Sequence, residues 1–385
     1  MYEPMEKSAM GNLNDFFSLL ESSEALREIH LNGTGAVAEL EDRLRRFYGM
    51  RYALCVSNAT IGLLAIALAL NLKRSEFVTT PYTYGASLAG WLLLENKPIF
   101  ADIDSRTLTL HPESVRERIT PRTKAILAVD IFGNPSDTVA LRKLADEFNL
   151  WYIADAAQSL GAFRDDLPAS ALADALVVSF TVGKTIFAGE GGAILTNHMD
   201  LYEKLIWYTQ HPHRQNRELG LHLDNEFALN GRIHPLAALW ANALFDASLE
   251  NLKRHRANCF DIIDALNETG LTQPIDFKKQ GIKPSFFRLT AAWKNKPKEM
   301  FLLRELKRRG FTLELEPPPV RLIYRQPAFV AQYGSMLNGV PRCPEAERQA
   351  RVRFCLKSAT PHENGLAVGV SVEAVPRDER RKTLR

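Results

Sequence analysis

Short apolar runs recur along the first two thirds of the chain, separated by stretches with apolar residues at helical spacing. A short, continuously apolar run is typical of a parallel strand that is covered on both faces. We predict strands at 53–56, 77–80, 99–101, 125–129, 151–154, 176–180 and 193–196. We predict helices at 61–72, 85–94, 112–119, 138–148 and 201–208. This alternation predicts a doubly wound α/β domain over about residues 35–250.

The pattern changes beyond this domain. Apolar residues at helical spacing, with Arg and Lys on the other face, predict one long helix over 235–266. The chain beyond residue 267 is richer in Pro and charge, and we predict a smaller α+β domain there. We therefore expect an N-terminal segment (1–34), a large domain (35–250) and a small C-terminal domain (251–385).

Composition narrows the class of protein. Of the 385 residues, 46% are hydrophobic and 24% are charged, as in ordinary globular proteins, and the net charge of +3 favours no nucleic-acid partner. The four cysteines form no CxxC pair, which favours reduced thiols. The longest apolar stretch, 61–70, is too short to span a bilayer, and the first residues lack the apolar core of a signal peptide. We expect a cytoplasmic protein without a membrane partner.

Two charged residues follow predicted strands, where ligands collect in open α/β sheets. Asp155 comes directly after the strand at 151–154. It is either a helix cap or the partner of a pyridinium nitrogen. Lys184 follows the strand at 176–180 and is flanked by apolar residues and by the Gly-rich loop 189–192. An amine in such surroundings has a lowered pKa, as a Schiff-base nucleophile requires, although most single lysines are solvated.

Two further strand ends carry weaker signals. The small polar turn at 57–60 lies between a strand and a helix, where it is either an ordinary N-cap or an anion site. Ser179 ends its own strand and could add a hydroxyl to such a site. Tyr84 follows the strand at 77–80, and an aromatic ring there can stack on a planar heterocycle.

The order of these signals along the chain is specific: an anion turn, an aromatic residue, an acid and a lysine. This order resembles the DegT/DnrJ/EryC1/StrS family of sugar aminotransferases, over nearly the whole chain. The matching motifs include Thr80-Pro81, Asp102-Ile103-Asp104, Phe132-Gly133-Asn134-Pro135, Asp155-Ala156-Ala157-Gln158 and Gly189-Glu190-Gly191-Gly192. The resemblance implies the PLP-dependent transferase fold type I, with a mostly parallel seven-stranded sheet, and pyridoxal 5′-phosphate (PLP) as the cofactor.

The resemblance also implies roles for individual residues. Lys184 would hold the cofactor as a Schiff base and move the proton, while Asp155 would pair with the pyridinium nitrogen. The remaining cofactor-binding residues would be Ala59, Thr60 and Ser179 at the phosphate, Tyr84 and Gln158 at the ring, and Asn230 and Arg232 of an Asn-x-Arg motif. In relatives this last motif reaches the neighbouring subunit's phosphate, which implies a homodimer with shared active sites.

One stretch departs from the family pattern. Residues 210–217 contain His211, Arg214 and Arg217, where the family has a short arginine-rich segment. Two histidines without a third ligand do not predict a metal site. We predict a polar loop that faces the substrate, with a plain solvated loop as the alternative.

The leading functional hypothesis is transfer of an amino group, from L-glutamate, to a keto sugar or keto-cyclitol of a natural-product pathway. A nucleotide-linked sugar is the favoured acceptor. Two alternatives are an aminotransferase for a non-sugar ketone or keto acid, and a PLP-binding regulator without turnover. A dinucleotide-dependent dehydrogenase is disfavoured, because Gly33-Thr34-Gly35 lacks the third glycine and the preceding strand of that fingerprint.

Overall fold

The computed structural model describes residues 18, 31–220, 225–318 and 320–358. Most of the predicted N-terminal segment (1–34) and the end of the predicted small domain lie outside the described residues. Within them, no helix is both long and apolar enough to cross a membrane.

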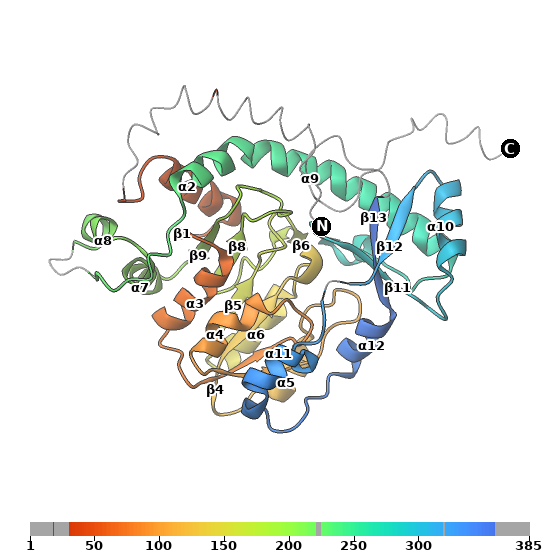
Figure 1. Cartoon of the computed structure of the whole chain (residues 1–385), viewed down its shortest axis with the longest axis horizontal. Coiled ribbons are helices and arrows are strands. Elements are labelled where there is room, and N and C mark those ends of the chain that lie inside the picture. Colours follow the sequence, from red (N-terminus) through yellow and green to blue (C-terminus); the bar gives the residue numbers. More distant parts are fainter. Residues whose placement is uncertain (1–17, 19–30, 221–224, 319, 359–385) are drawn as a thin grey trace.

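A seven-stranded sheet forms the centre of the large domain (Figure 1). Its strands in spatial order are β1 (Tyr52–Val56), β9 (Gly192–Thr196), β8 (Ala175–Ser179), β5 (Trp151–Asp155), β4 (Thr123–Val129), β2 (Glu76–Thr79) and β3 (Lys97–Phe100). The last five are mutually parallel, and β9 runs antiparallel to both of its neighbours. All seven predicted strands are confirmed to within two residues at each end, and the predicted fold class is confirmed.

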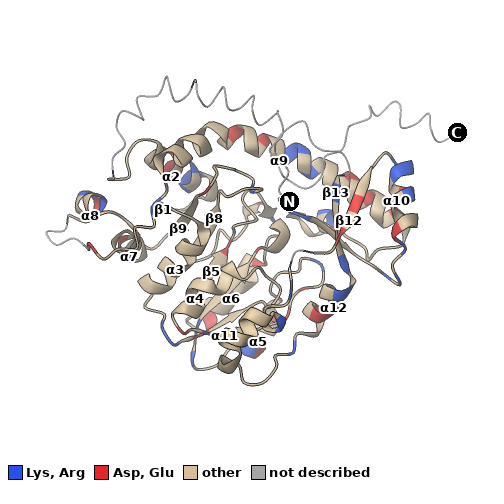
Figure 2. Ribbon diagram, viewed as in Figure 1, with Lys and Arg blue, Asp and Glu red and all other residues tan. Residues whose placement is uncertain are grey.

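Helices cover both faces of this sheet. They are α2 (Ala36–Tyr48), α3 (Ala59–Ala69), α4 (Ala86–Leu93), α5 (Pro112–Arg118), α6 (Thr138–Glu147) and α7 (Met199–Thr209). Alternate strand residues enter two separate cores, because successive side chains of a strand point to opposite faces. Helices α3 and α4 carry no charged residue (Figure 2), as suits their mostly buried positions. The five predicted helices are confirmed.

One helix, α9 (Pro235–Thr269), joins the two parts of the molecule and confirms the predicted long helix. It runs along the top of the molecule in Figure 1. Ala241 and Phe245 in its first half pack into a core of the large domain, whereas Cys259 and Ile262 belong to a third core. The proposed domain boundary at residue 250 therefore falls inside a continuous helix, between these two sets of contacts.

The third core belongs to a small antiparallel sheet. It consists of β11 (Leu289–Ala292), β13 (Arg353–Ser358) and β12 (Leu313–Glu316), with α10 (Glu299–Arg308) packed beside it. A second small sheet joins β6 (Phe163–Arg164), β7 (Leu167–Pro168) and β10 (Ile282–Lys283). Because β6 and β7 come from the large part of the chain and β10 from the small part, this sheet ties the two parts together.

The segment between β12 and β13 returns to the large domain. Tyr324, Phe329 of α11 (Pro327–Tyr333) and Cys343 pack into one of the cores of the large sheet. The carboxylate of Asp102 accepts hydrogen bonds of 2.8 Å from the backbone amides of Glu345 and Ala346 at the start of α12 (Pro344–Val352). The small sheet is thereby held against the strand ends of the large domain from two sides.

Candidate active site

Lys184 lies in the loop that follows β8 and is partly buried. Its Nζ is 4.2 Å from the ring centroid of Phe287, a residue from the segment that enters β11. The pKa of the Lys184 amine is lowered to about 8, chiefly because the amine is buried; the Asp155 carboxylate opposes this shift, and the nearby Arg288 adds to it. An amine with such a pKa is partly neutral near physiological pH, as a nucleophile must be.

Asp155 is the last residue of β5, and its side chain is fixed at both oxygens. Oδ2 accepts a 2.6 Å hydrogen bond from Ser87 Oγ of α4, and Oδ1 accepts a 3.0 Å bond from the amide of Ala157. The residue is only 7% exposed. Ser87 was missed in the sequence, although it lies one helical turn after Tyr84. The carboxylate is thus buried, oriented and available to a cationic ring nitrogen.

The predicted phosphate turn is open to an anion. Asn58 caps α3 by accepting a 2.9 Å hydrogen bond from the amide of Ile61. Among the described residues, the amides of Ala59 and Thr60 have no acceptor, as is usual in the first turn of a helix. The hydroxyl of Ser179, two strands away at the end of β8, is the other predicted phosphate ligand.

Gly192 keeps the space between these groups free. It is paired with Val56 of β1 on one side and with Ser179 of β8 on the other. A Cβ atom at this position would lie 2.8 Å from the Ala59 nitrogen and 2.7 Å from the Val178 oxygen. Any side chain here would fill the cradle in front of the turn, and only glycine leaves it open.

Tyr84 and Gln158 are the two residues predicted to contact the cofactor ring. Tyr84 precedes α4 and is 65% exposed, so its ring is free to stack on a ligand. The Oε1 atom of Gln158 accepts a 2.7 Å hydrogen bond from the amide of Phe132, and its backbone carbonyl accepts a 2.6 Å bond from Ser285 Oγ. Gln158 therefore also anchors the segment that carries Phe287 and Arg288.

These residues fit PLP: an open anion turn, an exposed aromatic ring, a fixed carboxylate and an amine follow the carboxyl ends of β1, β2, β5 and β8, respectively. Phe287 and Arg288 were not predicted from the sequence, because nothing in their local pattern shows that they lie next to Lys184. Among the described residues, no group of three or more His, Cys, Asp or Glu could hold a metal ion.

The stretch around His211 differs from the prediction of a polar loop, which is wrong: residues Pro212–Leu219 form helix α8, beyond β1 at the edge of the sheet. The ring of His211 caps this helix by accepting a hydrogen bond from the amide of His213. Arg217 contacts Glu218 on the same helix.

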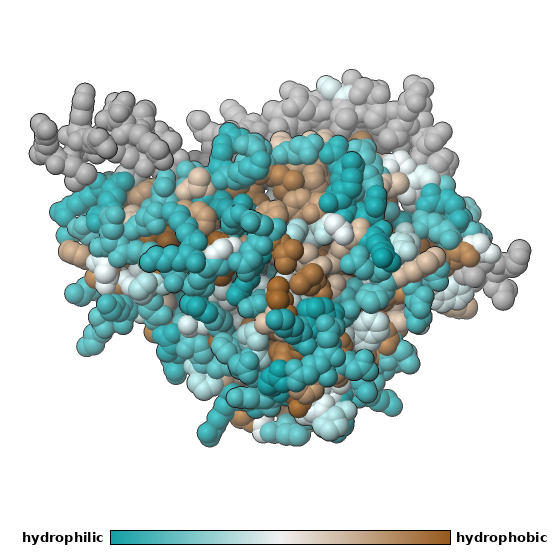
Figure 3. Space-filling model, turned by 180° about the vertical axis from the view of Figure 1, so that it is seen from behind, coloured by the Kyte–Doolittle hydropathy of each residue, from teal (hydrophilic) through white to brown (hydrophobic). Residues whose placement is uncertain are grey.

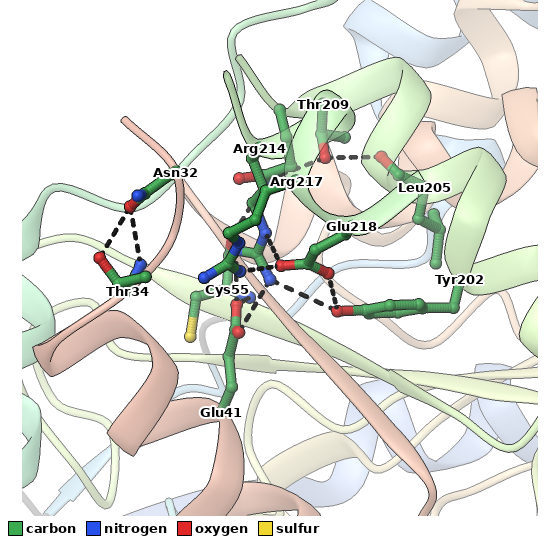
Figure 4. Close-up of polar contacts among 11 residues, drawn as sticks. Asn32, Thr34, Glu41, Cys55, Tyr202, Leu205, Thr209, Arg214, Arg217 and Glu218 are labelled. Atoms are coloured by element: carbon green, nitrogen blue, oxygen red, sulfur yellow. Dashed lines mark hydrogen bonds and ion pairs between the residues drawn. The ribbon is translucent and has the colours of Figure 1, made fainter. Parts of the chain in front are cut away.

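Arg214 is part of a buried ion-pair cluster (Figure 4). It is 1% exposed, its two Nη atoms donate to Glu41 of α2 at 3.0 and 2.9 Å, and its Nε donates to Glu218 at 2.9 Å. The two carboxylates raise the pKa of the Arg214 guanidinium, although its burial alone would lower it. Each of its three nitrogens donates to a carboxylate of this cluster, so the structure gives Arg214 a structural position.

Asn230 and Arg232 lie beside the phosphate turn on the outer edge of the sheet. The amide of Ser57 donates a 2.7 Å hydrogen bond to the carbonyl of Gly231, and Arg232 forms a β-bridge with Val56. Both residues of the motif line a cavity of about 340 Å³. The described residues around that cavity do not include Lys184 or Asp155.

The sheet topology, the lysine after β8 and the acid at the end of β5 together define a fold-type-I PLP-dependent architecture. The sequence profile of the DegT/DnrJ/EryC1/StrS aminotransferase family matches residues 19–362, and the chain belongs to that family. The resemblance stated from the sequence motifs is therefore confirmed.

Individual relatives agree with this assignment. A dTDP-4-amino-4,6-dideoxy-D-glucose transaminase of Shigella dysenteriae is 37% identical over 193 residues, which are 50% of this chain and 52% of the relative. A UDP-2-acetamido-2-deoxy-3-oxo-D-glucuronate aminotransferase of Pseudomonas aeruginosa is 37% identical over 177 residues, 46% of this chain and 49% of the relative. The chain thus matches about half the length of these relatives.

A solved structure extends the likeness to the whole fold. The structure of DesI in the presence of its TDP-sugar product superposes with a TM-score of 0.71 and 25% sequence identity, over 92% of this chain and 88% of that one.

Proposed function

We propose that this protein is a PLP-dependent aminotransferase that moves an amino group from a donor, such as L-glutamate, to a nucleotide-linked keto sugar. The observation that carries the proposal is the partly buried Lys184 amine, with its pKa lowered to about 8, next to the fixed carboxylate of Asp155. The two relatives and the DesI structure all bear names that refer to nucleotide-linked sugars.

The residues of the chain have separate tasks in this reaction. PLP, when bound, supplies a conjugated ring that takes up the electron pair left at the substrate carbon during proton transfer. The amides of Ala59 and Thr60 hold its phosphate. Asp155 keeps the ring nitrogen protonated, because its negative charge favours the cationic form.

Lys184 acts first by attachment and then by proton transfer. With PLP and the amino donor in the site, the neutral Lys184 amine next to Phe287 would accept a proton from the substrate carbon. The same group returns the proton to another carbon, so one side chain serves both directions. Phe287 covers the amine on the side of the small sheet and keeps water from it.

The test is the visible absorbance of the purified protein with PLP, recorded before and after L-glutamate is added. We expect a yellow band that bleaches with the donor and returns when a keto acceptor is supplied. A protein that stays colourless after PLP addition would contradict cofactor binding, and a yellow band that no amino donor bleaches would contradict amino-group transfer.

We further propose a homodimer in which Asn230 and Arg232 complete the neighbouring subunit's phosphate site. Within one chain they line a cavity apart from Lys184, and large apolar side chains next to them are exposed, with Phe227 at 96% and Leu229 at 42%. A second chain would cover such surface. On the side opposite to Figure 1, hydrophobic residues also gather in the middle of a largely hydrophilic face (Figure 3).

Complementation tests the shared site. A Lys184→Ala chain and an Asn230→Ala chain, each inactive alone, should recover part of the activity when they are mixed, because one site of the mixed dimer has both residues. If the mixed dimers form but remain inactive, the two residues do not serve one shared site.

A cytoplasmic location is part of the same proposal. The four cysteines are all buried and unpaired, which suits a reducing compartment.

A further inference from the structure

Two residues of the small part of the chain, Phe287 and Arg288, lie next to Lys184. The amide of Ser285 donates a 3.0 Å hydrogen bond to the Gly133 carbonyl, and the amide of Arg288 donates a 3.3 Å bond to the Phe132 carbonyl. Both bonds attach this segment to the loop after β4. The Phe287 ring then lies between two cations, with Lys184 Nζ at 4.2 Å and the Arg288 guanidinium carbon at 5.6 Å from its centroid.

Arg288 has no anionic partner. Its Nε is buried without any hydrogen-bond acceptor, and among the described residues no carboxylate pairs with its guanidinium. A partly buried guanidinium that pairs with nothing is costly, because it has lost water without gaining a counter-charge. An anion that binds to Arg288 would offset this desolvation cost.

The neighbouring Arg353 shows the contrast. It begins β13, and its guanidinium donates to Gln349 Oε1 at 2.9 and 2.6 Å and to Thr290 Oγ1 at 3.0 Å. The donors of Arg353 are used within the fold, whereas Arg288, whose charge lies close enough to lower the pKa of Lys184, keeps its Nε without an acceptor. The hydroxyl of Tyr82, which is also near Arg353, is buried and has no partner either.

We propose that Arg288 binds a carboxylate group of the substrate beside Lys184, and this inference rests on the aminotransferase function proposed above. A planar guanidinium binds a carboxylate through two parallel hydrogen bonds. The cofactor phosphate has its own site at the amides of Ala59 and Thr60, so it does not need Arg288. The carboxylate belongs either to the amino donor, next to the amine that reacts, or to an acid group on the acceptor.

Equilibrium binding to the PLP-loaded protein tests this without turnover. We would measure by calorimetry the affinity for 2-oxoglutarate, the keto acid that corresponds to L-glutamate, and for UDP-glucuronate against UDP-glucose, which differ by one carboxylate. The Arg288→Gln variant should bind the recognised carboxylate about 10- to 100-fold more weakly than the unmodified protein. A loss for 2-oxoglutarate assigns the carboxylate to the donor side, and a loss of preference for UDP-glucuronate assigns it to the acceptor.

Kinetics provides a second readout. In the donor half-reaction, donor-side binding predicts that Arg288→Gln raises the L-glutamate concentration for half-maximal bleaching by the same factor. Arg288→Lys keeps the charge and should recover part of the affinity. The matched control is Arg308→Gln on α10, which removes one charge from an exposed pair with Glu305 and should change neither measurement.

Two results would overturn the proposal. One is an Arg288→Gln protein, folded and yellow with PLP, that binds both carboxylate probes as tightly as the unmodified protein. The other is an unmodified protein that binds neither 2-oxoglutarate nor UDP-glucuronate in preference to UDP-glucose. Failure of the aminotransferase proposal is a separate observation, because it appears in the unmodified protein as a yellow band that no donor bleaches.

Discussion

Two arginines of this fold differ in how their charge is paired: Arg214 is fully buried, and Arg288 is partly buried. Arg214 lies between Glu41 and Glu218, and each of its three guanidinium nitrogens donates to one of these two carboxylates. Arg288 sits over the strand ends beside Lys184, with its Nε buried and unpartnered. Only the first arrangement is complete without a ligand.

The same contrast holds for the regions around them. The buried ion-pair cluster of Glu41, Arg214 and Glu218 joins α2 to α8. Gly33, with φ +75°, lies so close to it that a Cβ atom at this position would be 2.5 Å from Arg214 Nη1. In the region around Lys184, by contrast, the amine has a lowered pKa, and the amides of Ala59 and Thr60 have no acceptor among the described residues. A buried charge that is fully paired holds elements together, whereas one that is left unpaired marks a place for a ligand.

The largest expected effect is a loss of catalytic rate without a loss of stability. Lys184→Ala should slow the donor half-reaction by about 10²- to 10⁴-fold from lost proton transfer alone. Its free energy of unfolding should not fall, because no buried ion pair is removed. The rate of the half-reaction is measured from the change in absorbance during a single turnover, after PLP or its amine form has been added to the variant. The exposed Lys204→Ala on α7 is the control, and a rate near that of the control would refute the role of Lys184.

The next largest effect is a loss of stability, when the buried ion pair of Arg214 with Glu41 is removed. Arg214→Ala leaves Glu41 buried without its partner, and we expect the free energy of unfolding to fall by about 3–5 kcal/mol. Urea unfolding measures it. Arg217→Ala, which removes an exposed contact to the same Glu218, should cost less than about 1 kcal/mol. Equal losses in the two variants would mean that the cluster is not a structural anchor.

A smaller effect sharpens the description of the catalytic region. Ser87→Ala removes the 2.6 Å hydrogen bond to Asp155, which fixes one oxygen of its carboxylate. We expect PLP affinity and the half-reaction rate together to fall by about 10- to 100-fold, the usual range for a hydrogen bond to a charged group. Ser87→Thr keeps the hydroxyl and should retain most of both. If Ser87→Ala has normal affinity and rate, the Ala157 amide alone orients Asp155.

The smallest expected effect is on the pH dependence of the rate at which PLP attaches to Lys184. Below about pH 8 the Lys184 amine is mostly protonated and cannot attack PLP, so the rate at which the apoprotein turns yellow should rise with pH. It should gain only about twofold above pH 8, whereas an ordinary lysine would keep gaining to about pH 10. Arg288→Gln removes a nearby positive charge and should move the midpoint upward. A midpoint near pH 10 in the unmodified protein would contradict the lowered pKa.

Local pattern was enough for much of the molecule. Each of the seven strands is a short apolar run, and Asp155 and Lys184 were found because they follow such runs, at positions where parallel strands expose their carboxyl ends. The long helix from residue 235 was visible in its spacing. These features depend on neighbours in the chain, so the sequence by itself determined them.

The tertiary structure alone decided what the charged residues do. Arg214 was a candidate for the substrate until Glu41, 173 residues away in the chain, proved to be its partner. Arg288 attracted no attention, since nothing local shows that the segment before β11 comes to lie next to Lys184. Whether a charge is paired depends on contacts across long sequence separations, and those contacts exist only once the chain has folded.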